Sequence, residues 1–267
     1  MSGPTPAPSG PAVGPSADHD AAVSALADEG CAVVPDLLGP DEVARATAAL
    51  EEVFASEADV AVARGWRTDA YRVAYALPAK HPTFLDLCTH PGLGGLADAV
   101  LGPDCVVAGF NGQTMVPGGT GQRLHRDHPV PTPGTTLFLH LVCALDAFTP
   151  SNGATRVVPG THREPPADDA DLAVLEDRAV VLAAPAGAAV AFDATLVHAA
   201  GANATAAPRR ALHVFFARPW VHPHWDLLGS LAPEVAADLT ADQRRRLGGA
   251  TGPRRFDRAT RTVLRPR

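Results

Sequence analysis

The sequence predicts a mainly β fold, a double-sheet jelly roll with N-terminal helices packed outside it. Between Asp104 and Ala217 the chain carries many short runs rich in Val, Leu, Thr and Phe, which favour strands. Turn signals such as Pro117-Gly118-Gly119 and Pro159-Gly160 separate these runs. Ahead of them, apolar residues recur at helical spacing. Many short strands joined by such turns are typical of a jelly roll.

Most of the helices are predicted in the first hundred or so residues. Asp18 can cap a helix that ends at Gly30, and a short strand, Cys31–Val34, follows. Pro40 then starts a longer helix with acidic residues in its first turn. The buried stripe of this helix consists of Val43, Leu50, Val53 and Phe54. Two short helices are expected over 82–89 and 93–101.

The segment from Val60 to Lys80 has no clean period and contains Trp66, Tyr71 and Tyr75. We expect such a segment either to form a lid over a site or to fill the core under a loop. From residue 104 onward the period changes to that of strands. The strands are expected over 106–116, 135–145, 156–158, 179–182, 188–192, 196–198 and 210–217.

The domain organisation follows from composition. Residues 1–16 are mostly Pro, Gly, Ser and Ala, and we predict a disordered N-terminal tail. Residues 17–225 are predicted to form a single domain. The chain becomes helical and basic in pattern after Trp220, so we predict a helical or extended C-terminal tail over 226–267.

Charge and cysteine content exclude several classes of protein. The formal net charge is −7 and there is no basic stripe, so we expect neither nucleic acid nor a membrane as partner. No C-x-x-C pair is present, and the cysteines are predicted to be buried, reduced thiols. The most apolar run, 179–192, is too short to span a bilayer, and the N-terminus lacks a secretory signal. We expect a cytoplasmic protein, and the sequence does not predict its oligomeric state.

An imidazole and a carboxylate lie two residues apart in Gln122-Arg123-Leu124-His125-Arg126-Asp127. In an extended segment, residues i and i+2 project to the same face, so His125 and Asp127 converge. These two donors are two thirds of a 2-His-1-carboxylate triad, which binds non-haem Fe(II) and leaves coordination positions open. Alone, the motif is weak, because His and Asp two apart are common in surface loops.

The candidate third ligand is His198, which ends an apolar strand and is followed by small residues. A single histidine on an apolar strand is more often a core residue than a ligand. Arg209 makes a binding site around His198 more plausible than a core histidine. It stands just before an apolar strand, and an alternation of two places it on the same face as His213. A guanidinium inside a barrel needs an anionic partner, and a dicarboxylate would pair with it bidentately. The alternative is an ordinary surface arginine, and the adjacent Arg210 leaves the choice between the two open.

Three motifs stand in a fixed order along the chain. They are Gln122-x-Leu124-His125-Arg126-Asp127, the stretch Asn152-Gly153-Ala154-Thr155 through Pro159-Gly160-Thr161-His162, and His198-x-x-Gly201-x-Asn203-x-Thr205 with Arg209-Arg210-Ala211-Leu212. Together they resemble the phytanoyl-CoA dioxygenase family of Fe(II)/2-oxoglutarate-dependent oxygenases. The likeness runs from about Asp20 to Trp220 and implies a cupin-like double-stranded β-helix.

The resemblance implies a role for each matching position. The iron ligands would be His125, Asp127 and His198. Arg209 would hold the distal carboxylate of 2-oxoglutarate. Further co-substrate contacts would come from Gln122 and Thr155, for which plain turn and strand chemistry is the alternative. We expect support of the site or the core, rather than metal binding, from His128, His140 and His213. The candidate walls of a mostly apolar substrate pocket are Phe110, Met115, Arg123, Trp66 and Tyr71.

The reaction implied is oxidation of an unactivated C–H bond with O2, while 2-oxoglutarate is decarboxylated to succinate and CO2. Halogenating relatives have a small residue where this chain has Asp127, so we predict hydroxylation, with desaturation, ring closure and epoxidation as variants. We expect a small, largely apolar secondary metabolite as substrate rather than an acyl-CoA. One alternative is a cupin-type metalloenzyme that does not use 2-oxoglutarate. Another is a non-catalytic binding protein, which would need a broken triad, and here all three positions are filled.

Overall fold

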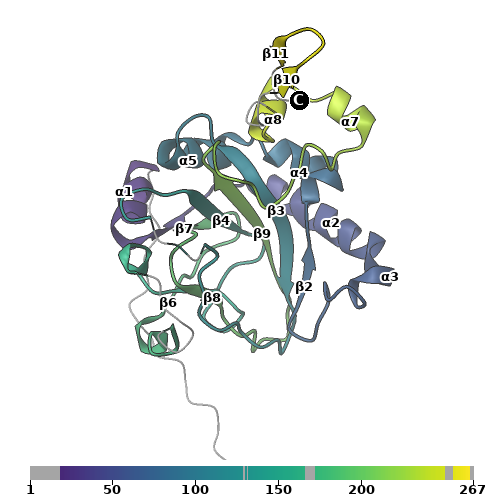
Figure 1. The fold of residues 1–267 in the computed structure, drawn as a ribbon. Coiled ribbons are helices and arrows are strands. Elements are labelled where there is room, and N and C mark those ends of the chain that lie inside the picture. The colour runs from purple at the N-terminus through teal and green to yellow at the C-terminus, as the bar shows by residue number, and fades with distance from the viewer. Residues whose placement is uncertain (1–18, 129, 131, 166–171, 250–254, 265–267) are drawn as a thin grey trace, which may run out of the picture.

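The computed structural model describes residues 19–128, 130, 132–165, 172–249 and 255–264. The predicted disordered tail, 1–16, and the predicted cap, Asp18, lie outside the described residues. Within them, two antiparallel sheets pack face to face, and helices cover the outer face of the larger sheet (Figure 1). The prediction of a jelly roll with helices outside it is confirmed.

The two sheets differ in size. The larger has the strand order β1 (Cys31–Val34), β7 (Ala189–Asp193), β4 (Phe138–Ala144), β9 (Arg209–Ala217), β3 (Val106–Met115) and β2 (Tyr71–Ala74). The smaller has the order β6 (Val180–Val181), β5 (Thr155–Val157) and β8 (His198–Ala200). All neighbouring strands are antiparallel. Each of these strands except β2 overlaps a predicted strand.

The helices before β3 form the outer layer of the fold. They are α1 (His19–Glu29), α2 (Pro40–Ser56), α3 (Ala58–Ala61), α4 (Pro82–Leu87) and α5 (Pro91–Leu101). Short 3-10 turns lie at Leu77–Ala79, Thr161–Arg163 and Glu176–Arg178. In α2 the predicted stripe faces the core, where Leu50 and Val53 are buried and Val43 and Phe54 pack against them half-buried. The stripe therefore attaches this helix to the larger sheet.

Strand β9 shows how the period-2 pattern divides the molecule into two layers. Leu212, Val214 and Phe216 point into the core under the helices. Arg209 and His213 point the other way and line a cavity between the sheets. The residues of β9 thus separate onto the two faces that the sequence predicts. The cavity lies on the face that no helix of the outer layer covers.

Helix α2 packs directly on β3 at Gly112. A Cβ at Gly112 would lie 2.3 Å from Cδ1 of Leu50 and 3.2 Å from Cδ1 of Leu77. Both leucines are fully buried, so neither can move aside freely. Any larger residue at Gly112 would push the helix away from the strand that carries part of the cavity wall.

Two regions differ from the predictions. The sequence does not predict β2, because the strand has only four residues. Its Arg72 pairs with Thr114 through the backbone, and the side chain of Arg72 points to α2, where it donates to Glu51 at 2.7 Å. The C-terminal segment contains α7 (Pro233–Ala237), α8 (Ala241–Arg246) and a hairpin of β10 (Arg255–Asp257) and β11 (Thr262–Leu264). The hairpin is not predicted. Leu227, Leu231 and Leu247 are buried in the core that α2 and α5 share, so no break in the core coincides with residue 225.

Two smaller predictions concern cysteines and membranes. The four cysteines are all buried and free, as predicted. None of the described helices is both long and apolar enough to cross a membrane.

We predict that Gly112→Ala lowers the free energy of unfolding by about 1–3 kcal/mol, because the added methyl group overpacks a full core. Gly95→Ala is the matched control. A Cβ at Gly95 would meet only ordinary contacts, the nearest at 3.5 Å, so this helical substitution should be neutral or stabilising by up to about 1 kcal/mol. Urea denaturation measures both. Equal stabilities of the two variants would contradict the tight contact of α2 with β3.

Candidate active site

Two histidines that are far apart in the sequence are held side by side by their own backbones. The N–H of His125 donates to the carbonyl of His198, and the N–H of His198 donates to the carbonyl of His125, both at 2.9 Å. Reciprocal bonds of this kind place the two side chains on one face of an antiparallel pair. The ring centroids are 4.4 Å apart. The backbone pair therefore delivers two imidazoles to one point.

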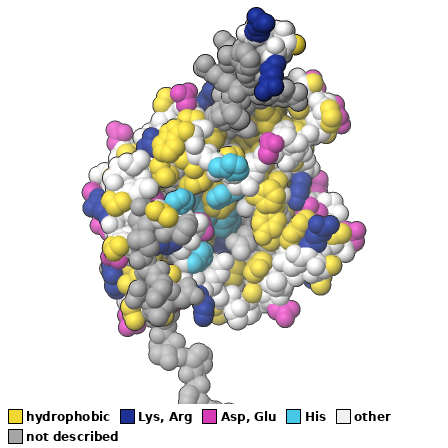
Figure 2. All heavy atoms as spheres, viewed as in Figure 1, with side chains coloured by type: hydrophobic (Ala, Val, Ile, Leu, Met, Phe, Trp, Pro, Cys, Tyr) yellow, Lys and Arg dark blue, Asp and Glu magenta, His cyan; other side chains and the backbone are white. Residues whose placement is uncertain are grey.

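Asp127 completes the cluster, as the i, i+2 spacing predicts. Its Oδ1 lies 3.5 Å from Nε2 of His125, and its Oδ2 lies 3.7 Å from Nε2 of His198. One donor atom from each residue lies within 4.8 Å of the others. The structure thus brings the three predicted ligand positions together. Several histidines gather near the centre of one face of the molecule (Figure 2).

The hydrogen bonds of the two rings fit a metal ion at this cluster. Nδ1 of His125 lies 3.1 Å from the carbonyl of Arg123, and Nδ1 of His198 lies 3.0 Å from that of Leu196. A carbonyl only accepts, so each Nδ1 carries the proton and each neutral ring keeps its Nε2 lone pair free. Two lone pairs that face a carboxylate repel it unless a cation lies between them. Two imidazole nitrogens and one carboxylate are the donor set of non-haem Fe(II).

The protonation equilibria of the cluster agree with this arrangement. Burial lowers the pKa of His198 to about 4, so the ring is neutral at neutral pH. Burial raises the pKa of Asp127, but the neighbouring His125 and the hydrogen bond from His140 outweigh it and hold this pKa well below its usual range. Asp127 is therefore an ionised donor at any ordinary pH.

A buried arginine lies in the same cavity. Arg209 is 1% exposed, and its guanidinium stacks on Phe148 with 4.6 Å between Cζ and the ring centroid. One nitrogen donates to the carbonyl of Gly153 at 2.5 Å. The other two, Nε and Nη1, are buried and have no partner in the described part of the chain. Burial lowers the pKa of Arg209 to about 10, which still leaves it cationic at neutral pH.

The adjacent Arg210 has a different environment. It points to the other face of β9 and bonds Glu51 at 2.7 Å and Asp146 at 3.1 Å. Of the two arginines, only Arg209 lines the cavity that contains the cluster. The volume of this cavity is about 120 Å³. The structure therefore favours Arg209 over Arg210 as the cation of this site.

Comparisons with known proteins agree with this geometry. Residues 26–211 match the family model described as phytanoyl-CoA dioxygenase (PhyH). The chain belongs to this family. It is similar to dioxygenase trt7 of Aspergillus terreus, with 30% identity over 75% of this chain and 73% of that one. It is also similar to the multifunctional dioxygenase ausE of Penicillium brasilianum, with 26% identity over 84% of this chain and 80% of that one.

Solved structures share the fold. The chain is similar to AviO1 from Streptomyces viridochromogenes, with a TM-score of 0.65 and 26% identity over 78% of this chain and 98% of that one. The family and its dioxygenase-named relatives identify the chain as an Fe(II)/2-oxoglutarate-dependent dioxygenase that acts on a small molecule. The donor set of the His-Asp-His cluster fits the iron.

Behind Asp127, the dioxygenase contains a chain of two further histidines. Nδ1 of His140 lies 3.1 Å from Oδ2 of Asp127, and Nε2 of His140 lies 3.1 Å from Nδ1 of His213. The ionised carboxylate only accepts, so His140 donates to it and accepts from His213 in turn. The ring of His140 is stacked on Phe215, 3.9 Å between centroids. Neither histidine belongs to the His-Asp-His cluster, and both stand where the sequence analysis expects them, in support of the site.

The predicted co-substrate contacts of the dioxygenase line the same cavity. Gln122 and Thr155 are both in its wall, with Arg209 and the cluster. Oε1 of Gln122 accepts from the N–H of Ala200 at 3.0 Å, which fixes the side chain. Thr155 pairs with Ala200 across β5 and β8.

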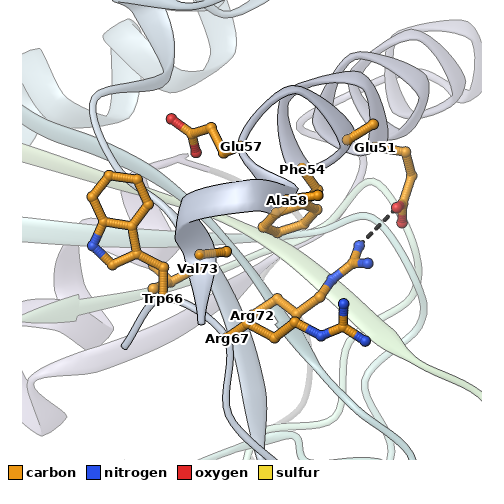
Figure 3. A pocket seen from close by; sticks show the side chains of 10 residues that line it. Glu51, Phe54, Glu57, Ala58, Trp66, Arg67, Arg72 and Val73 are labelled. Atoms are coloured by element: carbon orange, nitrogen blue, oxygen red, sulfur yellow. Dashed lines mark hydrogen bonds and ion pairs between the residues drawn. The ribbon is translucent and has the colours of Figure 1, made fainter. Parts of the chain in front are cut away.

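Four of the five residues predicted to line the substrate pocket line neither this cavity nor the one beside it. Phe110 is fully buried against Phe84 in the helix-side core, so its prediction as a wall is corrected: it occupies the opposite face of β3 from the cavity. Met115 is buried against Gly153, and Arg123 is exposed and offers its carbonyl to His125. Trp66 lines a separate cavity beside α2 and α3 (Figure 3).

Tyr71 lies in the wall of a second cavity, which opens beside the first and shares Gln113, Gln122, His213 and Phe215 with it. Three residues of these walls, Asn111, Gln113 and Phe215, are not among those predicted from the sequence. Period 2 on β3 was the signal that could find the first two, because it places them on the face opposite Phe110.

We predict that His140→Phe weakens metal binding by about tenfold or more, because partners behind a ligand typically contribute 10–100-fold to metal affinity. Phenylalanine keeps the stacking on Phe215 and removes both hydrogen bonds. Anaerobic Fe(II) titration measures the affinity. His222→Phe, at an exposed position, is the control and should bind as the parent does. Unchanged affinity in the His140 variant would show that the contact with Asp127 does not support the ligand.

Proposed function

We propose that His125, Asp127 and His198 hold the iron of this dioxygenase and that Arg209 binds the distal carboxylate of 2-oxoglutarate. The observation that carries the proposal is the cation in the cavity of the triad, two of whose nitrogens have no hydrogen-bond partner among the described residues. An uncompensated buried charge is costly, so a fold that keeps one has a use for it. A carboxylate would take both free N–H groups bidentately.

The remaining wall of the cavity supports the same proposal. A keto diacid needs polar contacts along its length, and the amide of Gln122 and the hydroxyl of Thr155 line the same cavity. The apolar side chains of Val142, Phe192 and Phe215 limit water around the triad. When bound, iron would activate O2, the oxidant, which takes two electrons from the oxidative decarboxylation of 2-oxoglutarate to succinate and CO2 and two from the C–H bond of the substrate.

The residues of the chain determine which reaction takes place, because they fill ligand positions of the iron and orient the substrate. Asp127 fills the third ligand position with a charged oxygen, so we propose hydroxylation as the main reaction, with desaturation, ring closure or epoxidation as variants. The substrate is proposed to belong to natural-product metabolism, supported by the Q-x-L-H-R-D form of the motif. Several relatives are named dioxygenases, and three of these are named multifunctional dioxygenases.

The alternative of a cupin-type metalloenzyme without 2-oxoglutarate is less well supported. It gives no role to a fully buried guanidinium whose only hydrogen bond in the described residues goes to the carbonyl of Gly153. Family membership also argues against it.

The two adjacent arginines provide a matched test. Arg209→Ala should weaken 2-oxoglutarate binding by about a hundredfold or more, because two hydrogen bonds to a charged group are lost. Arg210→Ala should leave the affinity unchanged, because Arg210 is engaged with Glu51 and Asp146 on the other face. The visible absorption band of the iron chelate, titrated anaerobically with 2-oxoglutarate, measures both.

Each outcome of this titration has a clear meaning. No band in the parent protein would remove the proposed co-substrate site. An unchanged affinity in the Arg209 variant, or a loss confined to the Arg210 variant, would reassign the arginine.

A further inference from the structure

The cavity that opens beside the triad is the place where a substrate can approach the iron site. Its volume is about 160 Å³, and its wall consists of Tyr71, Val73, Tyr75, Asn111, Gln113, Gln122, His213 and Phe215. The last three and Gln113 also line the cavity of the triad, so the two cavities adjoin along one wall. What lines the second cavity therefore selects the substrate of the proposed dioxygenase.

The carboxamides of β3 are oriented by the register of the sheet. Gln113 pairs with Val73 on β2 and Ala211 on β9, and Asn111 pairs with His213. Oδ1 of Asn111 accepts from the N–H of Ala76 at 3.2 Å. Only the carbonyl oxygen of an amide can accept from an N–H, so this bond leaves the NH2 group of Asn111 as the free end. Asn111 is therefore a hydrogen-bond donor to whatever occupies the cavity.

Gln113 adds a second polar group to the same wall. Its side chain is half-buried and makes no hydrogen bond to another described residue. The neighbouring Gln122 resembles Asn111, because its Oε1 accepts from Ala200 and its NH2 group stays free. Three carboxamides thus face one space, two of them fixed with the donor end outward.

Aromatic rings form the rest of the wall. The ring of Tyr75 stands between Trp66, at 6.0 Å, and Trp225, at 5.5 Å between centroids, and is held by both. Tyr71 and Phe215 lie in the same wall. Fixed aromatic faces suit the flat or apolar faces of a ring.

The lining contains no charged side chain among the described residues. A carboxylate or phosphate in this cavity would have no counterion, and an alkyl chain would leave the carboxamide donors unpaired. We propose that this cavity takes a neutral ring compound with carbonyl, ether or hydroxyl oxygens, which accept from Asn111 and Gln113. This substrate class rests on the proposed function, and it replaces the largely apolar metabolite that the sequence suggests.

Three probes of similar size and shape separate the classes. They are 4-chromanone, which is neutral and oxygenated, tetralin, its hydrocarbon counterpart, and chroman-2-carboxylate, an anion. Saturation-transfer NMR with the protein loaded with Zn(II) and 2-oxoglutarate measures their binding. We expect 4-chromanone to bind at least fivefold more tightly than either of the others. Equal signals from all three, including none from any of them, overturn the proposal.

Asn111→Asp tests the donor directly. Aspartate keeps the oxygen that accepts from Ala76 and so preserves the local structure, but it replaces the free NH2 group by an oxygen. The affinity for 4-chromanone should fall about tenfold, because one hydrogen bond is lost, while that for tetralin stays within twofold. Gln113→Glu should act in the same direction. Unchanged 4-chromanone binding in both variants overturns the proposal.

The same samples distinguish this inference from the proposed function. The Fe(II) chelate band with 2-oxoglutarate is recorded first for each protein. If the band is present and the probes fail, the substrate class is wrong and the co-substrate site stands. If the band is absent from the parent protein, the proposed function itself has failed.

Discussion

The reciprocal backbone pair of His125 and His198 is the contact on which the candidate site depends. Two hydrogen bonds of 2.9 Å join a segment before β4 to the first residue of β8, and they put both imidazoles on one face. Asp127 stands two residues after His125, at a bend in the chain, and its carboxylate reaches both rings. Each ring is then turned by a carbonyl of its own chain, two residues earlier. Backbone geometry, more than side-chain packing, therefore builds the triad.

Opposite charges line one cavity. Asp127 and Arg209 both stand in its wall, and neither contacts the other in the described part of the chain. A divalent cation beside the first and a dicarboxylate beside the second bring the formal sum to zero, since two positive charges, one negative, one positive and two negative cancel. The hydrogen bonds from His140 and His213 extend this balance, because they stabilise the ionised form of Asp127 without adding a charge. The site is thus arranged for both groups together.

The sequence predicted the parts of this arrangement that depend on spacing. Period 2 separates Arg209 from Arg210, and a spacing of two joins His125 to Asp127, so both follow from neighbouring positions in the sequence. The contact of His140 with Asp127 depends on the register of β4 against β7 and β9, which no local pattern encodes. The same limit explains Phe110, where an error of one residue exchanged the core face of β3 for the cavity face. Strand β2 is too short for its alternation to stand out.

The two sheets contribute unequal parts of the site, and this couples its chemistry to the core between them. The smaller sheet supplies His198 and Thr155, whereas the larger supplies Arg209, Asn111 and Gln113. At the proposed site, the distance from iron to substrate would therefore be a distance between sheets. Phe148 and Phe192 lie in the core between the sheets, and each also touches the site: the first packs against the guanidinium of Arg209, and the second lies tilted against His198, 4.5 Å between ring centroids. Because a close-packed interior transmits small displacements, a smaller residue at either position would shift the substrate wall relative to the triad. The C–H bond presented for oxidation is then determined by the inter-sheet core as well as by the residues that contact the substrate.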